Sequence, residues 1–130
     1  MPQLNKQAVM QSVLLPTELR IGNLTSAGIV VEIQKNCFYV HDGESSLKNT
    51  LFDIHQIPLT EDIISNICFN ENKVMGMYRL EATEDYSISF ALDNDMIYIG
   101  DDIEIRISET PLHRFQNIYF SLTGRELTVA

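Results

Sequence analysis

Two of the three histidines in this sequence lie within two residues of a carboxylate, the partner that acid–base or metal chemistry needs. His41 precedes Asp42 at the expected end of a strand, where ordinary surface residues explain the pair. His55 alternates with Asp53 on one face of another expected strand, so imidazole and carboxylate can lie close together. No third ligand accompanies either pair at metal-binding spacing. The sequence therefore favours structural roles for both histidines over a metal or acid–base role.

The third histidine belongs to a polar group near the end of the chain. His113 lies about one helical turn before Gln116 and Asn117 in a segment with helical periodicity. On a helical wheel, His113 and Asn117 are neighbours on the flank opposite the apolar stripe. We expect these side chains to hydrogen-bond the preceding loop and hold the helix on a sheet. The alternative is that His113, Gln116 and Asn117 form a ligand-binding or partner-binding face.

Acidic residues concentrate between Leu80 and Ile105, where the chain has eight carboxylates and no Lys or Arg. The whole chain has 9 basic and 18 acidic residues, a net charge of −9. Because phosphate backbones favour Lys and Arg through counterion release, direct nucleic-acid binding is disfavoured. The acidic stretch is either a solvated sheet rim or a surface that imitates DNA phosphates or meets a basic partner. The candidate binding residues on this surface are Asp93, Asp95, Asp101 and Asp102.

No motif in the sequence indicates a cofactor, a metal or a catalytic nucleophile. Asp93-Asn-Asp95 resembles the start of a calcium loop, but the later Gly and distal Glu are missing, so a hairpin turn is predicted. The sequence contains no Gly-rich phosphate loop, Gly-x-Ser-x-Gly, Cys-x-x-Cys or basic patch with aromatics. We therefore predict no cofactor, no metal and no catalytic residues. A catalytic group assembled from distant parts of the chain stays open.

Length and composition indicate one ordered domain. The 130 residues are 45% hydrophobic and 21% charged, which does not fit a disordered chain. Cys37 and Cys68 lie in apolar surroundings and are expected to be reduced, buried thiols of a cytosolic protein. No apolar run approaches the roughly 20 residues that span a bilayer, and polar residues interrupt the apolar start of the chain. We predict a lead-in over residues 1–17 and a single domain over 18–130.

The elements that must position these residues begin with a β-rich N-terminal part. Alternating apolar residues and turn signals predict strands at 19–21, 29–33, 37–41 and 51–55. Gly22-Asn23 and Asp42-Gly43 are expected to form turns, and 44–50 a polar loop. Such closely spaced short strands predict a curled sheet or a small SH3-like barrel.

A short helix follows, and then more strands. Thr60 is the expected N-cap of a helix that runs to about Cys68 and buries Ile63, Ile64 and Ile67. An antiparallel meander is then predicted, with strands at 74–80, 86–90, 96–99 and 103–107, and a further edge strand at 127–129.

The last helix is the best-marked element. Thr110 is the expected N-cap, Pro111 suits the first helical position, and Gly124 suits the left-handed residue after the last turn. An apolar stripe runs along one face of this helix and consists of Leu112, Phe115, Ile118, Tyr119 and Leu122. The prediction is an α+β fold in which this helix packs on the meander.

Three stretches resemble one protein family. They are Glu18-Leu-Arg-Ile-Gly-Asn23, Ile57-Pro-Leu-Thr60 and the motif LHxxQNxYxxLTGxEL, which begins at Leu112. The chain resembles, over about residues 18–128, small uncharacterised proteins of Bacteroidetes phages, prophages and mobile elements. Arg114 and Phe115 depart from the Gln and Leu usual at those positions. The resemblance implies a phage or mobile-element origin, and it implies no activity and no site residues.

Together these observations favour a non-enzymatic interaction protein that acts in the cytoplasm of a bacterial host. It is expected to bind a host or phage protein, with no membrane partner, and to counter a host defence system. The alternative is a binder of a small molecule such as a nucleotide signal, or a small enzyme acting on one, with His113, Gln116 and Asn117 near the pocket. A second alternative is a virion component.

Overall fold

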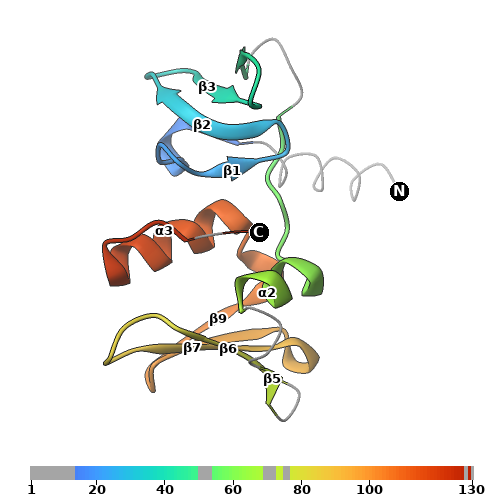
Figure 1. Cartoon of the computed structure of the whole chain (residues 1–130), viewed down its shortest axis with the longest axis vertical. Coiled ribbons are helices and arrows are strands. Elements are labelled where there is room, and N and C mark those ends of the chain that lie inside the picture. Colours follow the sequence, from blue (N-terminus) through green and yellow to red (C-terminus); the bar gives the residue numbers. More distant parts are fainter. Residues whose placement is uncertain (1–13, 50–53, 69–72, 75–76, 128, 130) are drawn as a thin grey trace. The chain divides into compact units, whose positions relative to one another are not determined.

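The computed structural model describes residues 14–49, 54–68, 73–74, 77–127 and 129 (Figure 1). The chain divides into two compact units, Met1–Ile57 and Pro58–Ala130. The predicted lead-in lies mostly outside the described residues. The single domain over 18–130 stays a prediction, and each unit is described by itself.

The first unit is an antiparallel meander. A 3-10 turn, η1 (Pro16–Glu18), precedes β1 (Leu24–Thr25), β2 (Gly28–Ile33), β3 (Phe38–His41) and β4 (Ser46–Lys48), which pair in the order β1-β2-β3-β4. The β2–β3 register shifts between Val30 and Glu32, and such a bulge bends a strand and increases its twist. The described strands therefore fit the curled-sheet alternative.

A tight turn and an apolar cluster hold this first sheet together. Gly28 has a φ of 133°, and a Cβ atom there would lie 2.3 Å from the carbonyl oxygen of His41, so only glycine fits. The Thr25 hydroxyl donates to the Gly28 carbonyl at 2.8 Å and closes the β1–β2 hairpin. The buried members of the cluster are Leu14, Leu19, Val30, Phe38, Val40 and Ile54.

Predictions for the first unit are confirmed at β2 and β3. The strand predicted at 19–21 is wrong, because the Asn23 side chain accepts the Arg20 N–H at 2.6 Å and fixes a turn there. The loop predicted at 44–50 is wrong at its centre, where Leu47 of β4 pairs with Val40. Of the strand predicted at 51–55, residues 51–53 lie outside the described residues. His55 forms an isolated bridge, and its carbonyl accepts the Ser26 N–H at 2.9 Å.

The second unit begins with α2 (Glu61–Ile67), which starts where the sequence predicts. The Thr60 hydroxyl accepts the Ile63 N–H at 3.4 Å, as an N-cap does. Leu59 and Ile64 are both buried, at the spacing of a hydrophobic staple. Ile67 is buried as predicted, whereas Ile63 is only partly buried.

A five-stranded antiparallel sheet follows α2. It contains β5 (Lys73–Val74), β6 (Met77–Glu81), β7 (Ser87–Ala91), β8 (Met96–Ile99) and β9 (Ile103–Arg106) in sequence order. Short 3-10 turns lie at η2 (Leu92–Asn94) and η3 (Ile107–Glu109). The strand predicted at 74–80 is two strands, β5 and β6. The other three predicted strands are confirmed to within one residue at their ends.

The register of this sheet separates an apolar face from a polar face. One row across β6 to β9 consists of Leu80, Ile88, Ile99 and Ile103, and the next of Tyr78, Phe90, Ile97 and Ile105. Between these rows, on the opposite face, lie Arg79, Ser89, Tyr98 and Glu104. The sheet therefore needs cover on one side only.

Helix α3 (Leu112–Thr123) supplies that cover. The Phe115 ring meets Phe90 of β7 edge-on, with ring centroids 5.2 Å apart. Figure 1 shows α2 and α3 on the same side of the sheet. Gly124 ends α3 in the left-handed conformation, as predicted. These elements confirm an α+β fold with the C-terminal helix packed on the meander.

Two details at the ends of α3 differ from the sequence predictions. Pro111, and not Thr110, occupies the N-cap position. The Thr110 hydroxyl instead donates to the Arg106 carbonyl at 2.7 Å and ties the helix start to β9. After the helix, Leu127 and Val129 are not in a strand, so the predicted edge strand is not formed at these residues.

Candidate functional site

The four aspartates predicted as a binding surface lie in two separate places. Asp93 and Asp95 belong to the connection between β7 and β8, whereas Asp101 and Asp102 form the β8–β9 turn. These connections lie at opposite ends of β8. A strand rises about 3.3 Å per residue, so the whole length of β8 separates the two pairs. The structure does not bring the four aspartates together.

Asp95 has a structural position in the β7–β8 connection. Its backbone is left-handed, with a φ of 56°, and it ends η2. Its carboxylate accepts the backbone N–H of Ser108 at 2.9 Å and the Ser108 hydroxyl at 2.5 Å. Its carbonyl accepts the Ile107 N–H at 3.1 Å. Asp95 therefore fastens η2 to η3, while Asp93 is exposed.

Asp101 and Asp102 instead share one end of the sheet with Glu84 and Asp85 of the β6–β7 turn. In an antiparallel meander, alternate turns lie at the same end. The Gly100 N–H donates to the Ser87 carbonyl at 3.0 Å, which holds the β8–β9 turn against the start of β7. We call these four exposed carboxylates, Glu84, Asp85, Asp101 and Asp102, the acidic end. Within the described part of the chain, none of the four forms an ion pair.

Local hydrogen bonds fix the shape of the acidic end. The Thr83 hydroxyl accepts the backbone N–H of Asp85 at 3.2 Å and of Tyr86 at 3.0 Å, which closes the β6–β7 turn. The Tyr86 side chain lies against Gly100, because a Cβ atom at Gly100 would come within 3.2 Å of its ring. Because Gly100 directly precedes Asp101, the Tyr86 ring lies beside the acidic end, and 41% of the Tyr86 surface is exposed.

Sequence reasoning missed Glu84 and Asp85 as partners of Asp101 and Asp102. The available signal was the number of strands between the turns, because two antiparallel strands return the chain to the same end of a sheet. Spacing along the chain alone favours Asp93 and Asp95 instead, since they are closer in sequence to Asp101.

The polar group of α3 is largely buried. His113 is 1% exposed and Gln116 is 3% exposed, on the same side of the first turns as Leu112 and Phe115. The prediction that His113 lies opposite the apolar stripe is therefore corrected, because the buried face of α3 is rotated toward His113 and Gln116. Asn117 is partly buried. Burial of this group fits a structural role better than an exposed partner-binding face.

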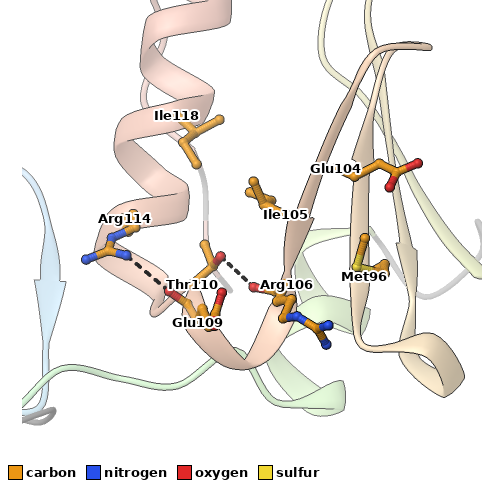
Figure 2. A pocket seen from close by; sticks show the side chains of 8 residues that line it. All are labelled: Met96, Glu104, Ile105, Arg106, Glu109, Thr110, Arg114 and Ile118. Atoms are coloured by element: carbon orange, nitrogen blue, oxygen red, sulfur yellow. Dashed lines mark hydrogen bonds between the residues drawn. The ribbon is translucent and has the colours of Figure 1, made fainter.

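An open pocket of about 400 Å³ lies between β9 and α3 (Figure 2). Ile105 of β9 and Ile118 of α3 point toward each other across it, while Glu104 points away from α3. The Arg114 guanidinium donates to the Glu109 carbonyl at 3.2 Å. His113, Gln116 and Asn117 are not among its lining residues, which are Met96, Glu104, Ile105, Arg106, Glu109, Thr110, Arg114 and Ile118.

His41 ends β3 and helps to shape the turn that follows, and the described residues form no metal site around any histidine. The backbone N–H groups of Ser45 and Glu44 donate to the Asp42 carboxylate and lower its pKa. The Gly43 N–H donates to Nδ1 of His41 at 3.0 Å, so this pair shapes a turn. Among the described residues, no group of three His, Cys, Asp or Glu side chains is placed to hold a metal ion. Asp53, the proposed partner of His55, lies outside those residues.

Both cysteines are buried free thiols, as predicted. Burial raises the pKa of Cys68 to about 12, because a thiolate loses its hydration in apolar surroundings. None of the helices in the described ranges is long and apolar enough to cross a membrane.

The fold and surface define an acidic α+β protein with four exposed carboxylates at one end of its second sheet. No protein-family model, no curated protein and no solved structure matches the chain. The resemblance to phage and mobile-element proteins therefore stays a prediction.

Proposed function

We propose that the chain is a non-enzymatic interaction protein of a phage or mobile element that acts in the cytoplasm of a bacterial host. Its partner is a host or phage protein with a basic surface, and binding counters a host defence system. The observation that carries the proposal is the acidic end, where two turns at the same end of the sheet present Glu84, Asp85, Asp101 and Asp102 to solvent.

Electrostatics supports this assignment. Carboxylates on neighbouring turns add their potentials, and a net charge of −9 extends the negative field. Complementary charge accelerates encounter with a basic partner and discourages acidic ones. The exposed Tyr86 adds an aromatic contact, a residue type enriched in interfaces. A surface of this kind gives binding that weakens as salt concentration rises.

The test is capture of partners from a host lysate, followed by mass spectrometry and by binding measurements with each purified candidate. We expect the variant Asp101→Lys/Asp102→Lys to lose at least tenfold in affinity, without a lower melting temperature. The matched control is Asp93→Lys/Glu109→Lys, which changes the charge equally at exposed positions in η2 and η3, at the opposite end of the same sheet. Unchanged affinity in the first variant, or equal losses in both, contradicts the proposal.

A further inference from the structure

Among the described strands, β9 has a neighbour on one edge only, and we call the other edge its free edge. It is the last strand of its sheet, and β8 is its neighbour on the other side. The Ile107 N–H donates to the Asp95 carbonyl, which extends the β8–β9 ladder by one residue. Hydrogen-bonded residues alternate along an antiparallel ladder, so Ile103 and Ile105 bond to β8. The backbone N–H and C=O groups of Glu104 and Arg106 therefore point to the open side of β9.

The side chains at this edge complement a second copy of themselves. Glu104 and Arg106 lie on the same face of the sheet, and Ile105 between them lies on the other. If a second β9 pairs antiparallel with Ile105 opposite Ile105, each Glu104 lies directly opposite Arg106 of the second copy. Opposite charges at such cross-strand positions stabilise pairing. An antiparallel second copy of Glu104-Ile-Arg106 therefore places an opposite charge beside each charged residue.

We propose that the chain forms a two-fold dimer by pairing β9 with β9 of a second copy, with the axis at Ile105. In this register, Glu104 of one copy exchanges two backbone N–H···O bonds with Arg106 of the other copy. The two-fold axis repeats this pair, so Arg106 of the first copy bonds Glu104 of the second in the same way. The Arg106 carbonyl already accepts the Thr110 hydroxyl, and its second lone pair is available for the incoming strand. The two sheets then form one continuous sheet, and both free edges are covered.

The pocket beside β9 receives the apolar part of this contact. Ile105 and Ile118 line the pocket and are only partly buried, and Ile103 is 45% exposed. Ile105 of the second copy lies on the same face as its counterpart and enters the pocket between Ile105 and Ile118. Each copy thereby removes apolar surface from water.

The surface around β9 is balanced in charge, unlike the chain as a whole. The net charge of −9 opposes self-association at most other places on the chain. The pocket lining is balanced, because Glu104 and Glu109 are matched by Arg106 and Arg114. The Arg106 side chain is 61% exposed, and its 4.0 Å approach to Asp95 leaves it able to turn toward a new carboxylate.

The first test is the mass of the full chain in solution by light scattering and sedimentation over a concentration series. We expect a species of twice the 14.8 kDa chain mass that dissociates on dilution. Glu104→Arg and Arg106→Glu should each weaken association about tenfold, because each places like charges opposite one another at both symmetric positions. Glu81→Arg, on β6 inside the sheet, is the control and should leave the mass unchanged.

The decisive test is rescue by charge exchange. The double variant Glu104→Arg/Arg106→Glu restores both opposite-charge pairs and should dimerise within about threefold of the natural sequence. An equimolar mixture of the two single variants should form a heterodimer, since every facing pair is again Arg with Glu. A monomeric natural chain, single variants that dimerise normally, or a failure of both rescues overturns the proposal. If a charge variant unfolds by circular dichroism, Ile105→Lys at the axis replaces it and should also abolish the dimer.

Discussion

At the scale of single residues, Thr60 determines where α2 begins. Its hydroxyl accepts the Ile63 N–H, one of the backbone donors that a helix start leaves unpaired. We expect Thr60→Ala to lower the free energy of unfolding by about 1 kcal/mol, whereas Thr60→Ser keeps the cap and most of the stability. Urea unfolding of the three proteins measures the difference. Equal losses in the Ala and Ser variants would show that the hydroxyl does not act as a cap.

Cys68 makes the free energy of unfolding depend on pH in the alkaline range. Burial raises its pKa from 9.0 to about 12 in the folded chain, so the folded state holds the thiol proton more tightly than the unfolded state. The stabilisation from this thiol is complete below pH 9 and is lost as the pH rises toward 12. We expect the free energy of unfolding to fall more steeply between pH 9 and 11 in the natural sequence than in Cys68→Ala. Parallel pH profiles would refute this.

At the scale of elements, the seating of α3 on the sheet depends on one aromatic contact. Phe115 is fully buried and meets Phe90 edge-on. We expect Phe115→Ala to cost about 3–5 kcal/mol of unfolding free energy, because it removes a large buried side chain and leaves a cavity. Phe120 of the same helix is 36% exposed, and Phe120→Ala should cost less than about 1 kcal/mol. Chemical denaturation compares the two variants, and similar losses would contradict this placement of the helix.

The elements with strong local signals were predictable from sequence. Thr60, Gly124 and the alternation in β7 act through their own neighbours, so their patterns predicted α2, the end of α3 and a strand. The errors arose where a contact outside the local pattern decides. Residues 19–21 alternate like a strand, but the hydrogen bond from the Arg20 N–H to the Asn23 side chain makes them a turn. The segment that forms β4 is polar like a loop, but it becomes a strand because it pairs with β3. Periodicity does not reveal such partners.

The candidate site was only half predictable for the same reason. Asp101 and Asp102 stand out in composition, but their neighbours Glu84 and Asp85 follow from strand order. Helical spacing placed His113 opposite the apolar stripe, whereas tertiary packing buries it together with Leu112 and Phe115. The acidic end is therefore a property of the topology, and the composition of one stretch indicates only part of it.

At the scale of the whole molecule, the division at Ile57 and Pro58 predicts that residues 58–130 fold without the rest of the chain. This segment contains a complete sheet with α2 and α3 on one side, and its roughly 70 residues exceed the size at which domains need staples. We expect the fragment to unfold cooperatively on heating and to show dispersed amide signals in NMR spectra. The same fragment with Phe115→Ala should melt at a lower temperature, because the contact with Phe90 lies within it.

A shorter fragment, residues 58–109, provides the control for that prediction. It keeps α2 and all strands of the second sheet but lacks α3, so the apolar row of Tyr78, Phe90 and Ile97 loses most of its cover. We expect it to remain unfolded or to aggregate, since a sheet with an uncovered apolar face is not stable in water. If residues 58–130 also fail to unfold cooperatively, the two units depend on each other and act as the single domain predicted for residues 18–130.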